Sequence, residues 1–329
     1  MRETRAPADD GVVLIALLWI LTILAVITLS FSRETFVEAA AARNGRDMTD
    51  GYYIARAGIE STIYQIYVKS FLTQMQPAAM QTQQADAIDM GKVTGQFGDG
   101  EYVVNVQDEL GKININYASE DQIKALLSAI GIQSPDMDII ADSITDWRDA
   151  DNIALPNGAE NDYYQGLQPP YLARNGALAS MEELLLIRGV TQDYYFGHRQ
   201  KTPDGQIIDR YGIARYFTVY TNRNSINVNY ASLPVLMSIP SMPPELAQKI
   251  FERVQQSPFL SMEDLSKEVG QGPGVLALLT TQRGTIFSLT AHGHRTGSKA
   301  MGVIRAIVSM DPREVTKHRI LYWNENIVN

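Results

Sequence analysis

An uncharged run of 20 residues, Val12–Phe31, begins directly after Asp9-Asp10-Gly11. As a helix that rises ~1.5 Å per residue, this run measures roughly 30 Å, which is the thickness of the hydrocarbon core of a bilayer. The residues that follow it are polar enough to face water. The sequence therefore predicts one membrane helix near its start, followed by a large body outside the membrane.

Composition limits what that body can be. About 300 of the 329 residues follow the run, enough for two domains, and 45% hydrophobic with 20% charged residues predicts a packed core. The net charge of −9 disfavours nucleic acid, because phosphate binding needs a basic surface, and it favours cations. The chain has no cysteine, which excludes thiolate metal sites, thiol nucleophiles and disulfides.

The apolar run is longer than the core of a typical secretory signal peptide. In addition, Leu29-Ser30-Phe31 is a poor site for signal peptidase. Two arginines precede the run and three follow it closely, so the positive-inside rule does not orient it. We therefore expect the run to stay in the protein as a membrane helix.

Helical patterning continues beyond the run. It extends through Val37–Arg43, and Asn44-Gly45 predicts a break. A second helix is expected from about Asp47 to Phe71, because its isoleucines at 59, 63 and 66 share one helix face. The glutamine-rich stretch from Thr73 to Gln84 is expected to be a loop.

Strand-like alternation of apolar and polar residues appears at 102–106 and returns at 285–291, 302–310 and 319–323. A long helical region, 111–283, separates the first strand from the other three. The sequence therefore predicts an α+β protein in which a large all-helical domain interrupts one small antiparallel sheet.

The helical region contains an internal repeat. The segment Ile113–Ser119 (ININYAS) returns as Ile226–Ser232 (INVNYAS), and Ser180–Leu184 (SMEEL) returns as Ser261–Leu265 (SMEDL). The two motifs are 61 residues apart in the first unit and 29 in the second. The first unit therefore carries about 32 extra residues, which we place around the acidic segment 146–171.

This acidic segment is the best candidate for a metal site. Its crowded carboxylates need a counter-charge, and a hard cation with six to eight oxygen ligands supplies one, which favours Ca²⁺ over Mg²⁺. The EF-hand register is missing. A solvated acidic loop and an acid/base pair of a hydrolase are the alternatives. The candidate ligands are Asp146, Asp149, Asp151, Asn157, Glu160 and Asp162.

Two other features are weaker candidates. His292 and His294 share one face of a strand, but a zinc site needs a third ligand that the local sequence lacks, so an exposed pair is favoured. Each repeat unit resembles a helix-hairpin-helix, whose Gly-x-Gly turn can meet phosphate. The second unit has Ile239–Pro244 (IPSMPP) at this turn, with no glycine and fewer amide donors. A DNA-binding role is therefore the alternative and not the main expectation.

Four features together resemble the type II secretion system protein K family of minor pseudopilins. These are the leader with its membrane helix, the ININYAS repeat, the loop with ITDWRDAD and PNGAENDYY, and the run SMEELLLIRG. The resemblance implies a pilin-like fold with a long N-terminal helix and a helical insert, bound calcium, and no enzymatic activity. It divides the chain into a cleaved leader 1–11, a membrane segment 12–31, a pilin-like domain 32–110 with 284–329, and the insert 111–283.

The same resemblance implies that prepilin peptidase, which cuts after a glycine, cleaves between Gly11 and Val12. Ala16 then occupies the fifth position, where most pilins carry a glutamate. That buried carboxylate needs a cationic partner on the subunit above, so its absence suits a subunit at the filament tip.

The expected place is the inner membrane, with one span and the C-terminal body in the periplasm. The expected partners are the minor pseudopilins I and J, together with H and the major pseudopilin G, in a pseudopilus that assists export of folded proteins. Nucleic acid is not an expected partner.

Overall fold

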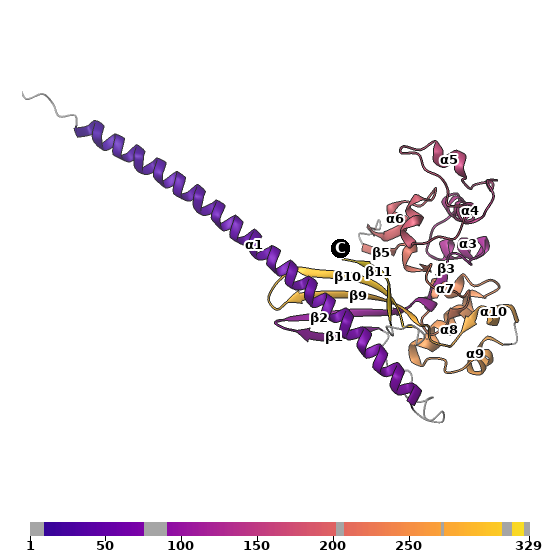
Figure 1. Ribbon diagram of the computed structural model, residues 1–329. Coiled ribbons are helices and arrows are strands. Elements are labelled where there is room, and N and C mark those ends of the chain that lie inside the picture. Colours follow the sequence, from indigo (N-terminus) through magenta and orange to yellow (C-terminus); the bar gives the residue numbers. More distant parts are fainter. Residues whose placement is uncertain (1–9, 76–90, 202–206, 271–272, 311–317, 326–329) are drawn as a thin grey trace, which may run out of the picture.

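A computed structural model describes residues 10–75, 91–201, 207–270, 273–310 and 318–325, and Figure 1 shows its arrangement. One helix, α1 (Asp10–Met75), runs through the predicted break at Asn44-Gly45 without interruption, so that prediction is wrong. A glycine inside a helix costs only ~1 kcal/mol, which its flanking turns can offset. Most of the predicted glutamine-rich loop, residues 76–84, lies outside the described residues.

The second half of α1 lies on an antiparallel sheet of five strands in the order β1-β2-β9-β10-β11. The four predicted strands are confirmed, and β1 is an addition that pairs with β2. The bounds are β1 (Lys92–Phe97), β2 (Gly100–Asp108), β9 (Ile286–Arg295), β10 (Met301–Ser309) and β11 (Arg319–Asn324).

The core of this pilin-like part forms between α1 and one face of the sheet. The predicted helix face of Ile59, Ile63 and Ile66 is buried there, against alternate residues of the strands such as Val104 and Leu289. The strand alternation places these side chains on the α1 side, as a half-buried sheet requires.

Three glycines allow the helix to approach the sheet closely. A Cβ on Gly51 of α1 would lie 2.7 Å from the Gly302 nitrogen and 2.9 Å from the Gly293 oxygen. Since these are backbone atoms of β10 and β9, a side chain at this position could be accommodated only by moving the helix away.

The chain leaves the sheet after β2 and returns to it at β9, and the insert lies between these strands. The insert has its own core, with Leu126, Ile144 and Phe217 among its buried side chains. Its helices are α3 (Glu120–Ala129), α4 (Asp136–Arg148), α5 (Asn161–Gln165), α6 (Gln192–Phe196), α7 (Leu233–Met237), α8 (Pro244–Gln256), α9 (Met262–Val269), α10 (Pro273–Ala277) and the 3₁₀ helices η1 (Glu109–Gly111), η2 (Met181–Leu186) and η3 (Ile213–Arg215).

The sequence predicts an all-helical insert, but short strands accompany these helices. The pairs are β3 (Ile113–Asn114) with β6 (Phe217–Thr218), β4 (Gly197–Lys201) with β5 (Ile207–Tyr211), and β7 (Ile226–Asn227) with β8 (Leu279–Thr280). Two of the pairs contain the first residues of the repeated motif. The β3–β6 and β7–β8 pairs are only two residues long, which is too short to give an alternating pattern in the sequence.

The repeat is visible as equivalent hydrogen bonds. In the first unit, the Asn116 side chain accepts from the Leu178 amide at 2.8 Å and donates to its carbonyl at 3.0 Å. In the second unit, Asn229 accepts from the Phe259 amide at 2.8 Å and donates to its carbonyl at 2.9 Å. We call these two arrangements the asparagine clamps. Each clamp fixes the segment just before the SMEEL or SMEDL motif.

Buried polar groups join the insert to the sheet. The Asp108 carboxylate at the end of β2 accepts from the amides of Leu110 at 2.9 Å and Gly284 at 2.7 Å. It therefore ties the outgoing chain to the returning one. Next to it, Lys112 and Glu109 form a buried ion pair. These bonds fix the direction in which the insert leaves the sheet.

Candidate functional site

The acidic loop lies between α4 and η2, which is where the spacing of the repeats predicts the extra residues. In the second unit, α8 is followed within a few residues by α9. Asp146 lies on the last turn of α4, Asp149 follows that helix as its C-cap, and Glu160 precedes α5 as its N-cap. Two helix ends therefore bring these three carboxylates to one place.

The three carboxylates form a compact cluster. Each of Asp146, Asp149 and Glu160 has an oxygen within 4.8 Å of those of the other two. Asp146 is fully buried and Glu160 is 4% exposed. Both carboxylate oxygens of Glu160 and Oδ1 of Asp149 are buried without a hydrogen-bond partner. Buried carboxylate oxygens normally have a partner, so this arrangement leaves ligand positions open.

Burial and mutual repulsion both raise the pKa values of these three carboxyl groups. Burial, together with the nearby charges of Asp146, Asp149 and Asp151, raises the pKa of Glu160 to about 7. Burial also raises the pKa of Asp146 to about 6, against the opposing effect of the Leu155 amide. The pKa of Asp149 is raised by burial and by Asp151. A cation among these groups would reverse these shifts.

The nearest basic side chain in sequence does not neutralise the cluster. The Arg148 guanidinium donates to the carbonyls of Ile115 and Ala118, which belong to the repeated motif. Lys124 pairs instead with Asp142, at 3.1 Å, one helical turn before Asp146. Neither side chain forms an ion pair with the three carboxylates of the cluster.

The backbone around Asp146 is shaped to hold this carboxylate. The Leu155 amide donates to both of its oxygens at 3.2 Å. A Cβ on Gly158 would lie 1.9 Å from Asp146 Oδ2, so only glycine fits against the carboxylate. The Gly158 carbonyl accepts from Arg188 at 2.8 Å, which ties this loop to the end of η2.

The other three predicted ligands lie outside this group of three. Asp151 is exposed, and its carboxylate accepts from the Ile153 amide at 2.8 Å, although its charge reaches Glu160. Asn157 donates through its side chain and its backbone to Asp142, at 3.0 and 3.1 Å. Asp162 is exposed on the first turn of α5.

Asn175 contacts the acidic loop, and the sequence analysis does not single it out. Its backbone is left-handed, with φ of 47°, and its side chain donates to the Asp151 carbonyl at 2.7 Å. Its Oδ1 is buried without a partner, like the oxygens of Glu160. The signal was available, because Asn175-Gly176 is a dipeptide typical of tight turns.

The structure also places the two weaker candidates, which are the histidine pair and the turns of the helix-hairpin-helix units. His292 and His294 are alternate residues of β9, paired with Val303 and Met301 of β10. Within the described residues, neither belongs to a group of three possible metal ligands. In the helix-hairpin-helix units, the turn amides of Gly131, Ile132 and Met242 donate to carbonyls of their own chain, so they are not free for phosphate.

A long helix with an exposed apolar first half, packed through its second half on an antiparallel sheet, defines the class of pilin-like proteins. Comparison with solved structures agrees with this class. The GspK-GspI-GspJ complex of the type 2 secretion system of enterotoxigenic Escherichia coli contains a chain that matches with a TM-score of 0.56. This match covers 88% of the present chain and 100% of that chain at 13% identity, and it establishes the fold alone.

Sequence comparisons show which family the chain resembles. The family model for protein K of the type II secretion system matches residues 103–197, and a helix-hairpin-helix model matches residues 221–280. Type II secretion system protein K of Aeromonas hydrophila is 26% identical over 57% of this chain and 61% of its own length. That of Pseudomonas aeruginosa is 28% identical over 52% and 50%. Over these regions the chain is similar to members of the type II secretion system protein K family.

Proposed function

We propose that the chain is a minor pseudopilin, a structural subunit without enzymatic activity, which helps a type II secretion system to export folded proteins across the outer membrane. One observation carries the proposal: a single helix continues from an apolar segment into the core of a pilin-like sheet, and a large insert interrupts that sheet. The aligned regions span about three fifths or less of the curated relatives. The role of the whole protein is therefore proposed here.

The membrane anchor in this proposal is the apolar half of α1. It contains the single candidate membrane span found among the described residues, and none of that segment is buried inside the protein. Leaving this segment in water would be unfavourable by tens of kcal/mol at ~25 cal/mol per Å². The proposed place is the inner membrane, with the body in the periplasm.

Processing by prepilin peptidase is proposed at the start of α1. Gly11 and Val12 are among its first residues, so cleavage between them would leave the helix intact with a free amine at its end. Mass spectrometry of the protein from a cell with the peptidase should give a mature chain that begins at Val12. A chain that retains Gly11 would contradict this assignment.

A position at the tip of the filament is supported by two features. Ala16 places no carboxylate in the membrane segment, so no cationic group above it is required. The insert projects beside the sheet, at the end away from the apolar half of α1 (Figure 1). Repeated along a shaft, an insert of this size would clash with its copies.

We propose Ca²⁺ as the ion of the acidic cluster, with Asp146, Asp149 and Glu160 as ligands. The orphaned, buried oxygens of Glu160 and Asp149 support it, since carboxylates are the donors that hard cations prefer. Isothermal titration with Ca²⁺ should give binding in the millimolar range or tighter. An absence of binding heat would contradict it.

The proposed partners are the minor pseudopilins I and J, with H and the major pseudopilin G below them. The solved relative is named as a complex of GspK with GspI and GspJ. Co-expression of the full chain with I and J of the same system, followed by purification on a tag of this chain, should recover a three-way complex. Recovery of this chain alone would contradict the proposal.

The alternative, a membrane-anchored DNA-binding protein, is not favoured. Net charge is −9, and the hairpin amides are engaged within the chain. Tight, strongly salt-dependent binding of duplex DNA would revive it.

A further inference from the structure

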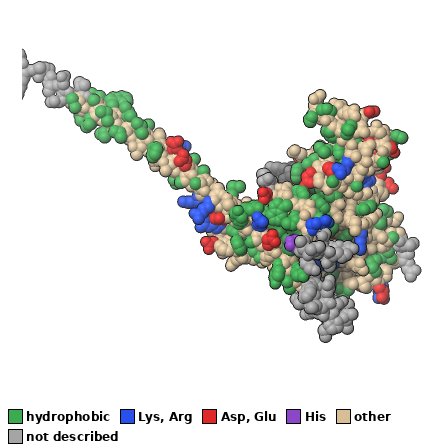
Figure 2. All heavy atoms as spheres, viewed as in Figure 1, with side chains coloured by type: hydrophobic (Ala, Val, Ile, Leu, Met, Phe, Trp, Pro, Cys, Tyr) green, Lys and Arg blue, Asp and Glu red, His purple; other side chains and the backbone are tan. Residues whose placement is uncertain are grey.

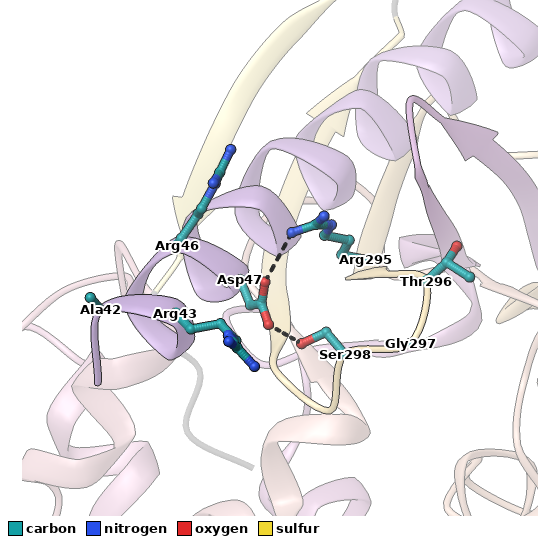
Figure 3. A pocket seen from close by; sticks show the side chains of 8 residues that line it. All are labelled: Ala42, Arg43, Arg46, Asp47, Arg295, Thr296, Gly297 and Ser298. Carbon is teal, nitrogen blue, oxygen red and sulfur yellow. Dashed lines mark hydrogen bonds and ion pairs between the residues drawn. The ribbon is translucent and has the colours of Figure 1, made fainter. Parts of the chain in front are cut away.

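A basic surface lies where α1 enters the folded body of this acidic protein. Figure 2 shows Lys and Arg side chains gathered on α1 at that point. Arg43 and Arg46 of α1 are exposed there, and Arg295 at the end of β9 faces them across a pocket of about 500 Å³ (Figure 3). The pocket lining carries a net charge of about +2, from these three arginines and Asp47.

The pocket has a fixed side and an open side. Asp47 accepts from Ser298 at 2.8 Å and pairs with Arg295 at 3.4 Å, so the β9–β10 turn is bound to the helix. Figure 3 shows Arg43 and Arg46 leaving α1 on either side of Asp47. Neither has a hydrogen bond or ion pair with another described residue. Two guanidinium groups are therefore available beside a rigid turn.

A second hollow of about 240 Å³ adjoins the first, and it shares Arg46 and Arg295. Two exposed aromatic side chains line it, Tyr53 of α1 and Phe97 at the end of β1, both 55% exposed. Asp50 and Asp99 also line this second hollow, so the net positive charge is confined to the first pocket and the aromatic side chains lie beside it. This pairing is typical of sites for a peptide segment that carries carboxylates beside an apolar side chain.

The position along α1 argues against lipid headgroups as the ligand. Arg43 lies 12 residues beyond Phe31, about 18 Å along the helix. The headgroup layer adds only ~5–8 Å to each side of the hydrocarbon core, and a membrane's charge is screened within ~8 Å at physiological salt. On an upright helix, the pocket faces proteins that stand beside it and not the membrane.

We infer that this pocket, with Arg43, Arg46 and Arg295 at its rim, binds a carboxylate-bearing segment of the adjacent pilin-like subunit. The inference rests on the proposed function, which supplies neighbours on the membrane-facing side of the body. Charge complementarity identifies the partner: a positive pocket on a chain of net charge −9 selects an acidic segment and orients the subunit as it docks.

The test uses the full chain co-expressed with the minor pseudopilins I and J. The double variant Arg43→Glu/Arg46→Glu should lower recovery of the partner about tenfold, and about 0.5 M salt should weaken the wild-type complex similarly. Arg43→Lys/Arg46→Lys should retain binding, and its amines should form zero-length cross-links with an Asp or Glu of the partner. The matched control, Arg223→Glu/Lys267→Glu, reverses two exposed charges of the insert and should change nothing.

Wild-type recovery with the Glu double variant would overturn the inference and leave the proposed function standing. Failure of the wild-type chain to recover I or J would remove the proposed function and this inference with it. A defect seen in vesicles of phosphatidylcholine and phosphatidylserine, but absent in detergent, would assign the pocket to lipid and overturn the inference. Circular dichroism of both double variants checks that they fold.

Discussion

The two repeat units of the insert share a scaffold and differ in their chemistry. Both use an asparagine clamp at the same place in the motif, Asn116 on Leu178 and Asn229 on Phe259. Only the first contains the acidic loop between its second helix and the clamp partner. The duplicated residues therefore hold the fold, and the unduplicated ones carry the candidate metal site.

The difference also shows how a long loop can be kept in one conformation. The second unit closes its clamp over a short connection, whereas the first must order about 32 more residues. Ordering a residue costs ~1–2 kcal/mol of backbone entropy, so the loop needs strong internal bonds. A bound Ca²⁺, the hydrogen bonds of the Leu155 amide to Asp146 and the bond of Arg188 to the Gly158 carbonyl would provide them.

The largest expected effect comes from the carboxylates of the first unit. Glu160→Gln should weaken calcium binding about 100-fold or more, because even residues that only hydrogen-bond to a metal's ligands contribute about 10–100-fold to its affinity. Isothermal titration of the purified chain measures this. The matched control is Asp264→Asn on α9 of the second unit, which should leave the affinity unchanged. An unaltered affinity in Glu160→Gln would remove this residue from the site.

The next effect separates the roles of the two clamps. Asn116→Ala and Asn229→Ala should each lower the free energy of unfolding by about 2–3 kcal/mol, since each leaves a buried amide and a carbonyl without partners. Thermal and urea denaturation check this. Asn116→Ala alone should also weaken calcium binding, because it loosens the end of the acidic loop. If the two variants changed the calcium affinity equally, the assignment of the metal site to the first unit alone would be contradicted.

Gly158→Ala should weaken calcium binding about tenfold with a smaller loss of stability. The new Cβ would lie 1.9 Å from Asp146 Oδ2 and must displace that carboxylate from the cluster. Gly274→Ala, in the second unit, is the control, because nothing lies within 4 Å of its added Cβ. A normal calcium affinity in Gly158→Ala would show that Asp146 is not a ligand.

The sequence predicts those parts of the molecule in which neighbouring residues decide the structure. The alternation at 102–106 and the isoleucines of α1 suffice for strand and helix, because each face is buried continuously. The strand β1 escapes prediction because Gly95 interrupts its pattern, and that glycine makes room for the Tyr102 ring across the sheet. The break expected at Asn44-Gly45 fails because local turn preference is weaker than a long helix around it.

At the candidate site, the sequence identifies the acidic loop but not which of its oxygens converge. Asn157 turns to Asp142, which lies one helical turn before Asp146 and depends on the packing of α4. Asn175, 15 residues beyond Glu160, reaches the Asp151 carbonyl of the loop from a left-handed backbone. Such tertiary choices have no periodic signal in the sequence.

The smallest expected effect is the pH dependence of the calcium response. The raised pKa values of Glu160, about 7, and Asp146, about 6, mean that the calcium-free fold binds more protons than the unfolded chain. That stabilisation is complete below the ordinary carboxylate pKa and is lost as pH rises through about 6–7. Calcium replaces the protons, so the gain in melting temperature on adding calcium should be larger at about pH 8 than at about pH 5.5. An equal gain at both pH values would contradict proton competition at the cluster.

The most direct test of the account is the position of the chain in an assembled pseudopilus. A small tag on the exposed insert, for example in the α9 region, can be labelled with gold and viewed by electron microscopy of sheared filaments. The account predicts one label at one end of each filament, with the cognate system still secreting its substrates. Labels spaced along the shaft, or filaments at normal length without any label, would contradict a tip subunit.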